Sequence, residues 1–311
     1  MSIKKVTQHP TQNEELIFDR SHSVIFGNCL EILSDLNGSV ELTFLDPPFN
    51  QQKDYFSCPD DLPESEYWEN MREVCAKVFH LTSDGGAIYF MQREKNSEEV
   101  LRVLRETGWT LQNLIIWKKM TSAVPSNLRF GKAFQIIAYA TKGKRPRVFN
   151  RLRIDPPLLK NQKYERENGV FVTDVWDDIR ELTSGYFAGD EAIRNKDGVR
   201  FHKQQSPIAL LLRILLSSTK IGDLVLDPFA GTGTCATVAK QLQRNSISIE
   251  IDKKNAAQIE KRLISIRKAD LIERFFDVYR CTENLDAIWG KDFFIQPEPV
   301  AKSWTQTLFT M

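Results

Sequence analysis

The sequence predicts an α/β protein built on a doubly wound, mostly parallel sheet. Short apolar segments rich in β-branched and aromatic residues alternate with segments of helical spacing along most of the chain. One apolar segment, 40–45, stops at two prolines, and another, 224–226, opens through a glycine turn into a helical segment. Alternation of this kind is typical of a parallel sheet with helices on both faces.

The first half of the chain reads as strands separated by two helices. Apolar runs predict strands at Val24–Phe26, Val40–Leu45, Gly86–Met91, Leu111–Trp117 and Ala133–Ala140. Helical spacing predicts helices at Glu66–Leu81 and Lys95–Thr107. Residues 1–21 lack periodicity and are expected to form an arm, so this half of the main domain spans 22–143.

A long segment without a clear period interrupts the alternation. Residues 144–203 are rich in Arg, Pro, Gly and Asn, and we expect an inserted module rather than a disordered excursion. Its aromatic residues could hold it in place: Phe149, Tyr164, Phe171, Trp176, Tyr186 and Phe187. In the second half, 204–276, we expect helices at Ser206–Thr219, Thr234–Leu242 and Lys254–Phe276 and strands at Leu224–Leu226 and Ser246–Ile251. Residues 277–311 are expected to form a tail.

The composition is that of an ordinary soluble protein, for which we expect a cytoplasmic location. Of 311 residues, 41% are hydrophobic and 27% are charged, and no apolar run reaches membrane-spanning length. The N-terminal residues lack the apolar core of a signal peptide. The five cysteines form no CxxC pair and the four histidines show no ligand spacing, which predicts reduced thiols and no metal site.

The net charge of +1 hides a strong segregation of charge. Residues 117–166 contain 13 Lys and Arg against two acids, whereas residues 54–73 contain seven acids and one base. A charge run alone is more often a solvated loop than a binding site. A basic segment of this density is also the electrostatic signature of a polyanionic partner.

The motif Asp46-Pro47-Pro48-Phe49 directly follows the strand 40–45. Proline has no N–H to donate to a strand ladder, so the strand must end there. This end presents a carboxylate that only accepts hydrogen bonds, carbonyl groups held in fixed directions by the prolines, and an aromatic face. Such groups suit a flat ring that bears an amino group, although the motif alone is equally compatible with a plain turn.

A second motif, Asp227-Pro228-Phe229-Ala230-Gly231-Thr232-Gly233-Thr234, joins the strand 224–226 to a helix. Glycines in such a turn permit close backbone approach to a ligand, and the helix N-terminus offers free N–H groups. Glu250 lies near the end of the next strand, about 20 positions later, where an acidic residue commonly binds ribose hydroxyls. This half of the chain therefore looks built for an adenosine-containing cofactor.

Together the two motifs resemble those of amino-methyltransferases that act on DNA bases with S-adenosylmethionine. In that family, Asp-Pro-Pro-aromatic is the catalytic motif and Phe-x-Gly-x-Gly is the cofactor motif. The catalytic motif comes first here, which resembles the β group, whose motif order is circularly permuted. The resemblance covers roughly residues 22–276 and implies a Rossmann-like methyltransferase fold with an inserted target-recognition module. It also implies that 111–117 and 135–140 form an antiparallel edge pair.

The resemblance implies a role for each motif residue. Asp46 and the Pro47 carbonyl would accept the hydrogens of the exocyclic amine, and Phe49 would stack on the base, so the catalytic residues are Asp46, Pro47, Pro48 and Phe49. The cofactor-binding residues would be Asn28, Cys29, Asp46, Gln205, Ser206, Asp227, Phe229, Gly231, Gly233, Thr234 and Glu250. The segment 202–207 takes the place of the carboxylate-binding element but has Ser206 where Lys is common, which leaves the carboxylate ligand open.

The expected partner is double-stranded DNA, from which the target base must be extruded because its amine is unreachable inside a duplex. We expect DNA contacts from Lys118, Lys119, Arg129, Lys132, Lys142, Lys144, Arg145 and Arg147. The setting would be a restriction-modification or solitary modification system. The β-group resemblance is also compatible with a homodimer.

Several alternatives remain open from the residues themselves. Asp46 favours adenine N6 within this family, and cytosine N4 is the runner-up because either amine could use the same acceptors. A nicotinamide-dependent oxidoreductase would account for the glycine turn and Glu250 but leaves Asp46–Phe49 unexplained. A non-catalytic DNA-binding subunit is opposed by the intact catalytic motif. Family members that act on RNA mostly have Asn at the position of Asp46.

Overall fold

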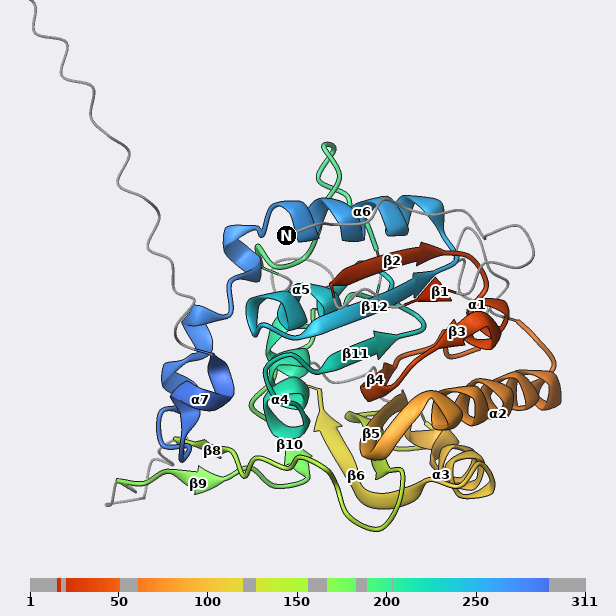
Figure 1. Cartoon of the computed structure of the whole chain (residues 1–311), viewed down its shortest axis with the longest axis horizontal. Coiled ribbons are helices and arrows are strands. Elements are labelled where there is room, and N and C mark those ends of the chain that lie inside the picture. Colours follow the sequence, from red (N-terminus) through yellow and green to blue (C-terminus); the bar gives the residue numbers. More distant parts are fainter. Residues whose placement is uncertain are drawn as a thin grey trace, which may run out of the picture.

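The computed structural model describes residues 16–17, 21–50, 61–119, 127–155, 167–182, 189–202 and 204–290. An eight-stranded sheet in the order β10-β6-β7-β5-β4-β11-β12-β2 forms its centre (Figure 1). Its strands are β2 (His22–Phe26), β4 (Val40–Leu45), β5 (Thr82–Arg93), β6 (Thr110–Lys118), β7 (Phe134–Thr141), β10 (Val175–Trp176), β11 (Leu224–Asp227) and β12 (Asn245–Glu250). Within this sheet β7 runs antiparallel to β5 and β6, and the other pairs are parallel. The predicted mostly parallel sheet is confirmed.

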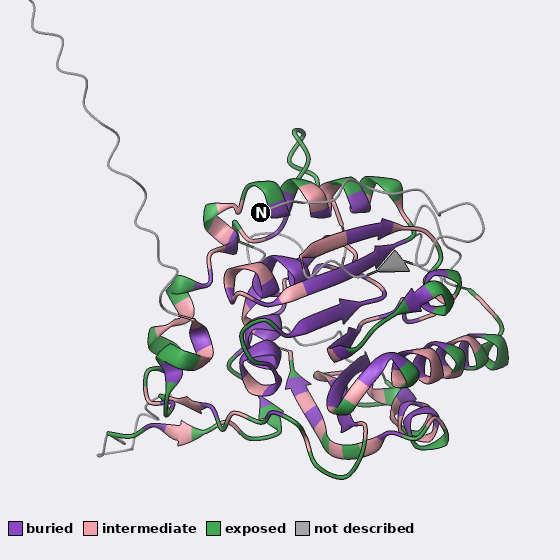
Figure 2. Ribbon diagram, in the orientation of Figure 1, coloured by how far each residue is buried: buried purple, intermediate pink, exposed green. Residues whose placement is uncertain are grey.

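Helices cover both faces of the sheet, as a doubly wound fold requires (Figure 1). Helices α1 (Cys29–Asp35), α2 (Glu64–Leu81) and α3 (Ser97–Glu106) pack on one face, and α4 (Ile208–Ser218), α5 (Thr234–Gln241) and α6 (Lys253–Ile264) pack on the other. Side chains of β5 show the alternation directly. Ile88 and Phe90 join the cluster around α2, whereas Ala87 and Tyr89 join the cluster around α4. The strands are consequently buried on both sides (Figure 2).

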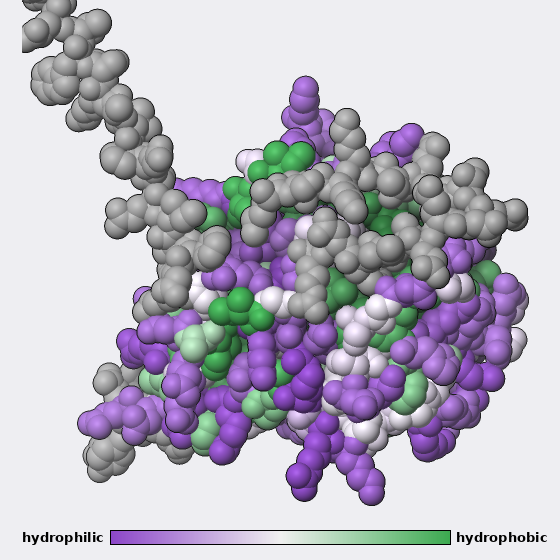
Figure 3. All heavy atoms as spheres, viewed as in Figure 1, coloured by the Kyte–Doolittle hydropathy of each residue, from purple (hydrophilic) through white to green (hydrophobic). Residues whose placement is uncertain are grey.

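The surface helices are amphipathic. In α2 the buried side chains include Tyr67, Met71, Val74 and Val78, a spacing of three or four that forms one stripe. Hydrophilic side chains dominate the outer surface over α2 and α3 (Figure 3). The helical spacing in the sequence therefore reflects the burial of one apolar stripe of the helix against the sheet.

One predicted helix was wrong in its length. The helix expected at Lys254–Phe276 ends at Ile264 and gives way to short 3-10 turns, η3 (Lys268–Asp270), η4 (Glu273–Phe275) and η5 (Asp277–Tyr279). Ser265 is extended, with φ −136° and ψ 104°. The buried pair of Arg262 and Asp270, at 3.0 Å, explains the break. Eight residues of continuous helix would separate these side chains by roughly 12 Å along the axis.

Short described parts of the expected arm and tail form secondary structure. Within the expected arm, Leu16–Ile17 forms strand β1. It pairs in parallel with β3 (Leu36–Asn37), which belongs to the main domain. At the other end α7 (Leu285–Trp289) buries Trp289 to 2% exposure. Trp289 contacts Phe276 edge to face, so part of the expected tail belongs to the core.

The described parts of 144–203 pack against the main domain. Leu152, Trp176 and Ile179 belong to the same buried cluster as α4. Strand β10 lies outside β6, so the confirmed antiparallel pair β6–β7 is not at the edge as expected. A separate small sheet joins β8 (Arg153–Ile154) to β9 (Val170–Phe171). Of the expected aromatic anchors, Trp176 is buried, Phe149 stacks on Tyr139 while half exposed, and Phe171 is 40% exposed. Tyr164, Tyr186 and Phe187 lie outside the described residues.

The centre of the sheet contains a topological switch point. Strands β4 and β11 are parallel neighbours, and the chain moves outward from β4 to β5 and from β11 to β12. In open α/β sheets, ligands bind in the crevice at the carboxyl ends of strands at such a point. Both sequence motifs follow these two strands directly.

Two features, a membrane-spanning helix and a metal-binding cluster, are absent from the described ranges. No helix among them is long and apolar enough to cross a membrane. No cluster of three or more His, Cys, Asp or Glu side chains in the same ranges could hold a metal ion.

Candidate active site

The two sequence motifs share one cavity of about 650 Å³ at the carboxyl ends of β4, β11 and β12. Asp46, Pro47 and Pro48 line it from one side, and Phe229, Gly231 and Thr234 line it from the other. The remaining predicted cofactor residues on its wall are Asn28, Cys29, Gln205, Ser206, Asp227 and Glu250. The structure therefore brings together segments some 180 positions apart, as the resemblance required.

Asp46 is a poorly compensated acid at this cavity. The Ser206 hydroxyl donates a hydrogen bond to its Oδ2 at 2.9 Å. Burial raises the pKa of Asp46 to about 7, and the Ser206 hydrogen bond and the charge of Lys119 oppose this rise only in part. Ser206, predicted to bind cofactor, thus also lowers the pKa of Asp46, the predicted catalytic carboxyl.

The turn after β4 is fixed by residues that the sequence did not reveal. The Tyr67 hydroxyl donates to the Pro48 carbonyl at 2.8 Å, and Gln92 Nε2 donates to the Tyr67 oxygen at 2.8 Å. Asn50, in the left-handed conformation at φ 52°, donates to the Leu62 carbonyl at 2.7 Å. Tyr67 lies on α2 and Gln92 on β5, where nothing in the local pattern marks them.

Phe49 does not line the cavity. Its side chain is 3% exposed and belongs to the buried cluster that contains Phe44 and Tyr89. The structure thus places Phe49 beneath the turn, where it packs the strand end against the core. Its expected stacking on a base stays a prediction, and it would require the ring to rotate out of the core.

The glycine turn needs glycine at two positions for different reasons. Gly231 has φ 53° and Gly233 has φ 75°, both in the left-handed region that other residues rarely adopt. A methyl group on Gly233 would also lie 2.6 Å from Cγ2 of Ile259 on α6. Gly231 has space on its cavity side, so the turn is open toward a ligand at Gly231 and closed toward α6 at Gly233.

Glu250 ties the glycine turn to the end of β12. Its Oε2 accepts from the Gly231 N–H at 2.7 Å, and its Oε1 accepts from the Asp252 N–H at 2.9 Å and from Asn255 at 3.3 Å. Burial raises the pKa of Glu250 despite these bonds. Asp227 is also buried, and both burial and the neighbouring Asp46 raise its pKa. The cavity therefore carries three acidic side chains that burial shifts toward protonation.

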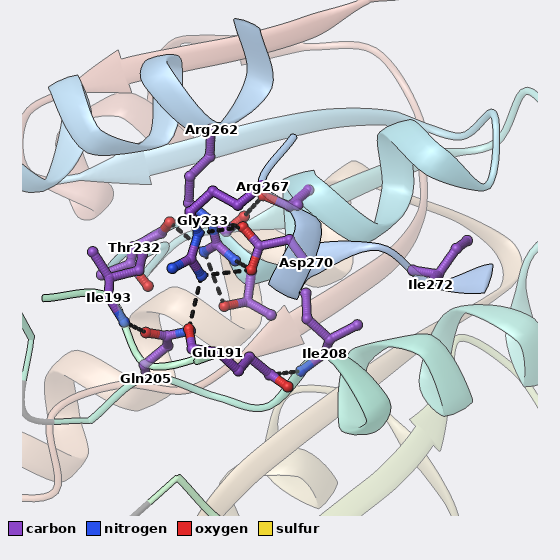
Figure 4. A network of polar contacts seen from close by, with 12 residues as sticks. Glu191, Ile193, Gln205, Ile208, Thr232, Gly233, Arg262, Arg267, Asp270 and Ile272 are labelled. Atoms are coloured by element: carbon purple, nitrogen blue, oxygen red, sulfur yellow. Dashed lines mark hydrogen bonds and ion pairs between the residues drawn. The ribbon is translucent and has the colours of Figure 1, made fainter. Parts of the chain in front are cut away.

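A polar network holds the turn to the chain before α4 (Figure 4). Arg262 donates to the Thr232 carbonyl at 2.7 Å and pairs with Asp270, and Arg267 reaches the Glu191 carbonyl at 2.7 Å. Glu191 Oε1 accepts from the Ile208 N–H at 2.6 Å, at the start of α4. These contacts hold the glycine turn through Arg262 and the start of α4 through Glu191.

Two predicted cofactor residues have structural partners. Gln205 Oε1 accepts from the Ile193 N–H at 3.0 Å, and its Nε2 donates to the Glu191 carbonyl at 3.0 Å. Asn28 caps α1 through a bond from the Leu30 N–H at 3.0 Å. Their place on the cavity wall keeps a ligand role open, but their side-chain polar groups already serve the fold.

The expected DNA-binding residues separate into two groups. Lys118, Lys119, Arg129 and Lys132 lie at the carboxyl end of β6 and the start of β7, at the same edge of the sheet as Asp46. Lys142, Lys144, Arg145 and Arg147 follow the other end of β7, at the opposite edge. Lys142 donates to the Thr82 carbonyl at 2.8 Å, and Arg147 pairs with Asp223 before β11. The position of this second group does not support contact with a base in the cavity.

Within the group near the cavity, the four cations differ. Lys118 and Arg129 are exposed. Lys132 pairs with Glu94 at 2.7 Å. Lys119 lies over the Trp117 ring, and burial lowers the pKa of Lys119 to about 7 against the opposing charges of Glu181 and Asp46. Its surroundings therefore make Lys119 a neighbour of Asp46 rather than a free phosphate ligand.

Comparison with known proteins agrees with this geometry. A DNA methylase family model of the N6/N4 type matches residues 40–261. The Type II methyltransferase M.HinfI of Haemophilus influenzae is 30% identical over 274 residues, which are 82% of this chain and 71% of that protein. M.HpaI of Haemophilus parainfluenzae is 30% identical over 244 residues, 78% of this chain and 74% of that protein.

Solved structures show the same fold. The M1.HpyAVI–SAM complex has a TM-score of 0.53 at 24% identity and covers 77% of this chain and 98% of its own. The cytosine-N4-specific PvuII DNA methyltransferase has a TM-score of 0.56 at 18% identity and covers 86% of this chain and 93% of its own. With its family model spanning both motifs and the cavity between them, the chain belongs to the N6/N4 DNA methylase family.

Proposed function

We propose that this DNA methyltransferase transfers a methyl group from S-adenosylmethionine to N6 of an adenine extruded from duplex DNA. The observation that carries the proposal is the single cavity shared by Asp46 and the Gly231 turn at the switch point of the sheet. The likeness to two Type II methyltransferases supports methylation of a fixed DNA sequence, as in a restriction-modification system. Adenine is favoured over cytosine N4 by Asp46 at the first motif position.

The residues of the cavity fit the proposed cofactor. A volume of about 650 Å³ lies within the range of cofactor pockets. Glu250 and the backbone around Gly231 line the cavity and would face the ribose and the amino-acid end. Phe229 and Ile249 would offer apolar surface to the adenine ring. When bound, S-adenosylmethionine supplies an electrophilic methyl group on a sulfonium. Asn28, Phe229, Gly231 and Glu250 are the residues expected to hold it.

Asp46 would activate the amine and orient it. The lone pair of an exocyclic amine is delocalised into the base ring, which makes the nitrogen a poor nucleophile. Hydrogen bonds accepted by the Asp46 carboxylate and the Pro47 carbonyl would localise that lone pair and aim it into the cavity. The bond from Tyr67 to Pro48 holds the two prolines in place for this task. The proton released from the amine after transfer has a nearby acceptor in Asp46.

The ionisation of Asp46 would set the pH range of the reaction. Because burial raises the pKa of Asp46 to about 7, the carboxyl is protonated below that pH and loses acceptor capacity. The Ser206 hydroxyl stabilises the charged form. We expect activity to rise with pH through this region.

The DNA would approach the edge of the sheet that holds Asp46. Lys118 and Arg129 are exposed there, and Phe130 is 98% exposed beside Arg129. Cations at this edge can neutralise phosphates, and an exposed aromatic ring can contact a disturbed base step. Base extrusion costs a few kcal/mol, and contacts of this kind would offset it.

Identification of the modified nucleoside tests the proposal. Duplex DNA is incubated with the protein and S-adenosylmethionine, digested to nucleosides and analysed by mass spectrometry, with Asp46→Asn as the inactive control. The expected product is N6-methyladenine. N4-methylcytosine would keep the mechanism and correct the base, whereas no methylated nucleoside on DNA of varied sequence would contradict the proposal.

A further inference from the structure

Arg200 lies on a short hairpin that forms one wall of the cavity. The hairpin contains the antiparallel bridge between Arg194 and Arg200, and the Asn195 N–H donates to the Val199 carbonyl at 2.8 Å. Its tip extends beyond α6 in the green segment of Figure 1. Arg194 is exposed, whereas Arg200 is half-buried and lines the cavity.

The guanidinium of Arg200 lacks the partners that a buried cation needs. Its Nε and Nη2 atoms are buried, and neither has a hydrogen-bond partner among the described residues. Buried donors without partners are costly, and a buried charge is more so. The arginines that are buried as whole residues in the described ranges have partners: Arg213 has Asp178 at 2.8 Å, Arg244 has the Thr219 carbonyl at 3.0 Å, and Arg262 has Asp270 at 3.0 Å.

The charges around Arg200 leave it without compensation. Arg194 is its partner across the bridge, and two like charges on paired residues repel. The carboxylate of Glu250 already accepts three hydrogen bonds, and Asp252 caps α6 through the N–H groups of Lys254 and Asn255 at 2.7 and 3.1 Å. Burial and the positive charge of Arg200 both lower the pKa of His202, two residues along the chain. The site calls for an anion that the described residues do not supply.

Arg200 lies two residues before His202, which is close to the glycine turn. A methyl group on Gly231 would lie 3.9 Å from Cε1 of His202. Ser206 stands where the family commonly has Lys, and its hydroxyl is taken by Asp46. Position 206 therefore supplies no cation to this cavity, and Arg200 is a cation on its wall with unused donors.

We propose that Arg200 binds the carboxylate at the amino-acid end of S-adenosylmethionine, in place of the lysine that is absent at position 206. A planar guanidinium presents two parallel N–H donors that match a carboxylate, a geometry that lysine cannot offer. The inference rests on the proposed function and assigns the one cofactor group that the sequence left without a ligand. A phosphate of the DNA is the other anion that could reach an arginine at this cavity.

The test compares two ligands that differ only in this carboxylate, S-adenosylmethionine and decarboxylated S-adenosylmethionine. Each is titrated by calorimetry into the protein without DNA, so that no turnover occurs. The wild-type protein is expected to bind the carboxylate-bearing ligand roughly tenfold to a hundredfold more tightly, the range for a hydrogen-bonded charge pair. Arg200→Ala should lose that preference by weakening only S-adenosylmethionine, and Arg200→Lys should restore part of it.

Lys196→Ala is the matched control, because it removes an exposed cation from the same hairpin. It should bind both ligands as the wild-type protein does. If Arg200→Ala does not fold, as judged by thermal unfolding, Arg200→Gln replaces it and is expected to lose the same preference while keeping a side chain of similar reach.

Three outcomes would overturn the inference. The variant could keep the wild-type preference for the carboxylate, or it could weaken both ligands equally, which would mean a structural role for the hairpin. It could also bind S-adenosylmethionine normally and bind duplex DNA less tightly, which would assign Arg200 to a phosphate. Failure of the proposed function would look different, because the wild-type protein would then bind neither ligand or would methylate no DNA.

Discussion

Two aspartates, Asp270 in the interior and the half-buried Asp46 at the cavity, show how this fold treats charge in opposite ways. Asp270 is 0% exposed and receives hydrogen bonds from both Arg262 and Arg267. Burial alone would raise the pKa of Asp270, but these two arginines outweigh it and the pKa is lowered. Asp46 has one hydroxyl donor, and burial raises the pKa of Asp46 to about 7.

The difference separates a carboxylate whose hydrogen-bonding capacity is used by the structure from one that keeps capacity for a ligand. A fully paired acid in the interior has no capacity left for a ligand. An acid with unsatisfied acceptor capacity at a cavity is costly to the fold and marks a functional site. We expect changes at the two positions to separate stability from activity.

Asp270→Asn is expected to have the largest effect, on stability. It leaves the buried Arg262 without a counter-charge, which typically costs about 3–5 kcal/mol. Because pairing lowers the pKa of Asp270, its contribution is present above the ordinary value of 3.8 and is lost as the pH falls below it. Urea unfolding at neutral pH measures the loss. Glu99→Gln, in a partly exposed pair with Arg102 on α3, is the control and should leave the free energy of unfolding close to that of the wild-type protein.

Asp46→Asn is expected to have the opposite signature. Methyl transfer should fall by at least about 10²-fold, the usual effect of removing one well-placed polar group from a transition state. The free energy of unfolding at pH 8 should rise by roughly 1–3 kcal/mol, since a charged form that burial disfavours has been removed. Because the folded state raises the pKa of Asp46 to about 7, this gain should grow as the pH rises toward that value. A less stable variant with full activity would remove Asp46 from its role.

Ser206→Ala is expected to have an intermediate effect. The Ser206 hydroxyl lowers the pKa of Asp46, so its loss should move the midpoint of the activity profile to higher pH by roughly one unit. Single-turnover rates measured from about pH 5.5 to about pH 9 would cover both midpoints and show the shift. Ser248→Ala is the control, because that buried hydroxyl has no partner among the described residues and its removal should leave the midpoint unchanged.

The smallest effect is expected on DNA binding, in which the two basic groups should differ. Lys118→Ala with Arg129→Ala is expected to weaken DNA binding and to reduce the slope of log affinity against log salt by about 2, or about one for each phosphate contact. Lys144→Ala with Arg145→Ala, at the opposite edge of the sheet, should leave the slope unchanged. Filter binding at several salt concentrations compares them. Equal slopes for both double variants would contradict this division and would mean that DNA contacts are spread over the whole basic segment.

The sequence predicted the sheet, most of its strands and the two motif turns, because each depends on local rules. The run Val40–Leu45 before two prolines can only end a buried strand, and Gly233 is required by its own backbone and by Ile259. Parallel strands then bring both turns to one edge, and the shared cavity follows from this topology.

The remaining features depend on contacts between distant residues, which no local pattern contains. Tyr67 reaches Pro48 from another helix, and the pair of Arg262 and Asp270 ends a helix that its periodicity extends. The basic segment was read as one patch along the chain, but strand β7 carries its two ends to opposite edges of the sheet. Arg200 lies in a segment without period, and its unused donors, on which the proposed role depends, become visible only in the structure.

The pH dependence of the wild-type single-turnover rate tests the central claim most directly, that an ionised Asp46 in the shared cavity activates the amine. With the pKa of Asp46 near 7, the logarithm of the rate should rise with a slope of about one below that pH and level off above it. A rate that is flat from pH 5.5 through about pH 8 would contradict it.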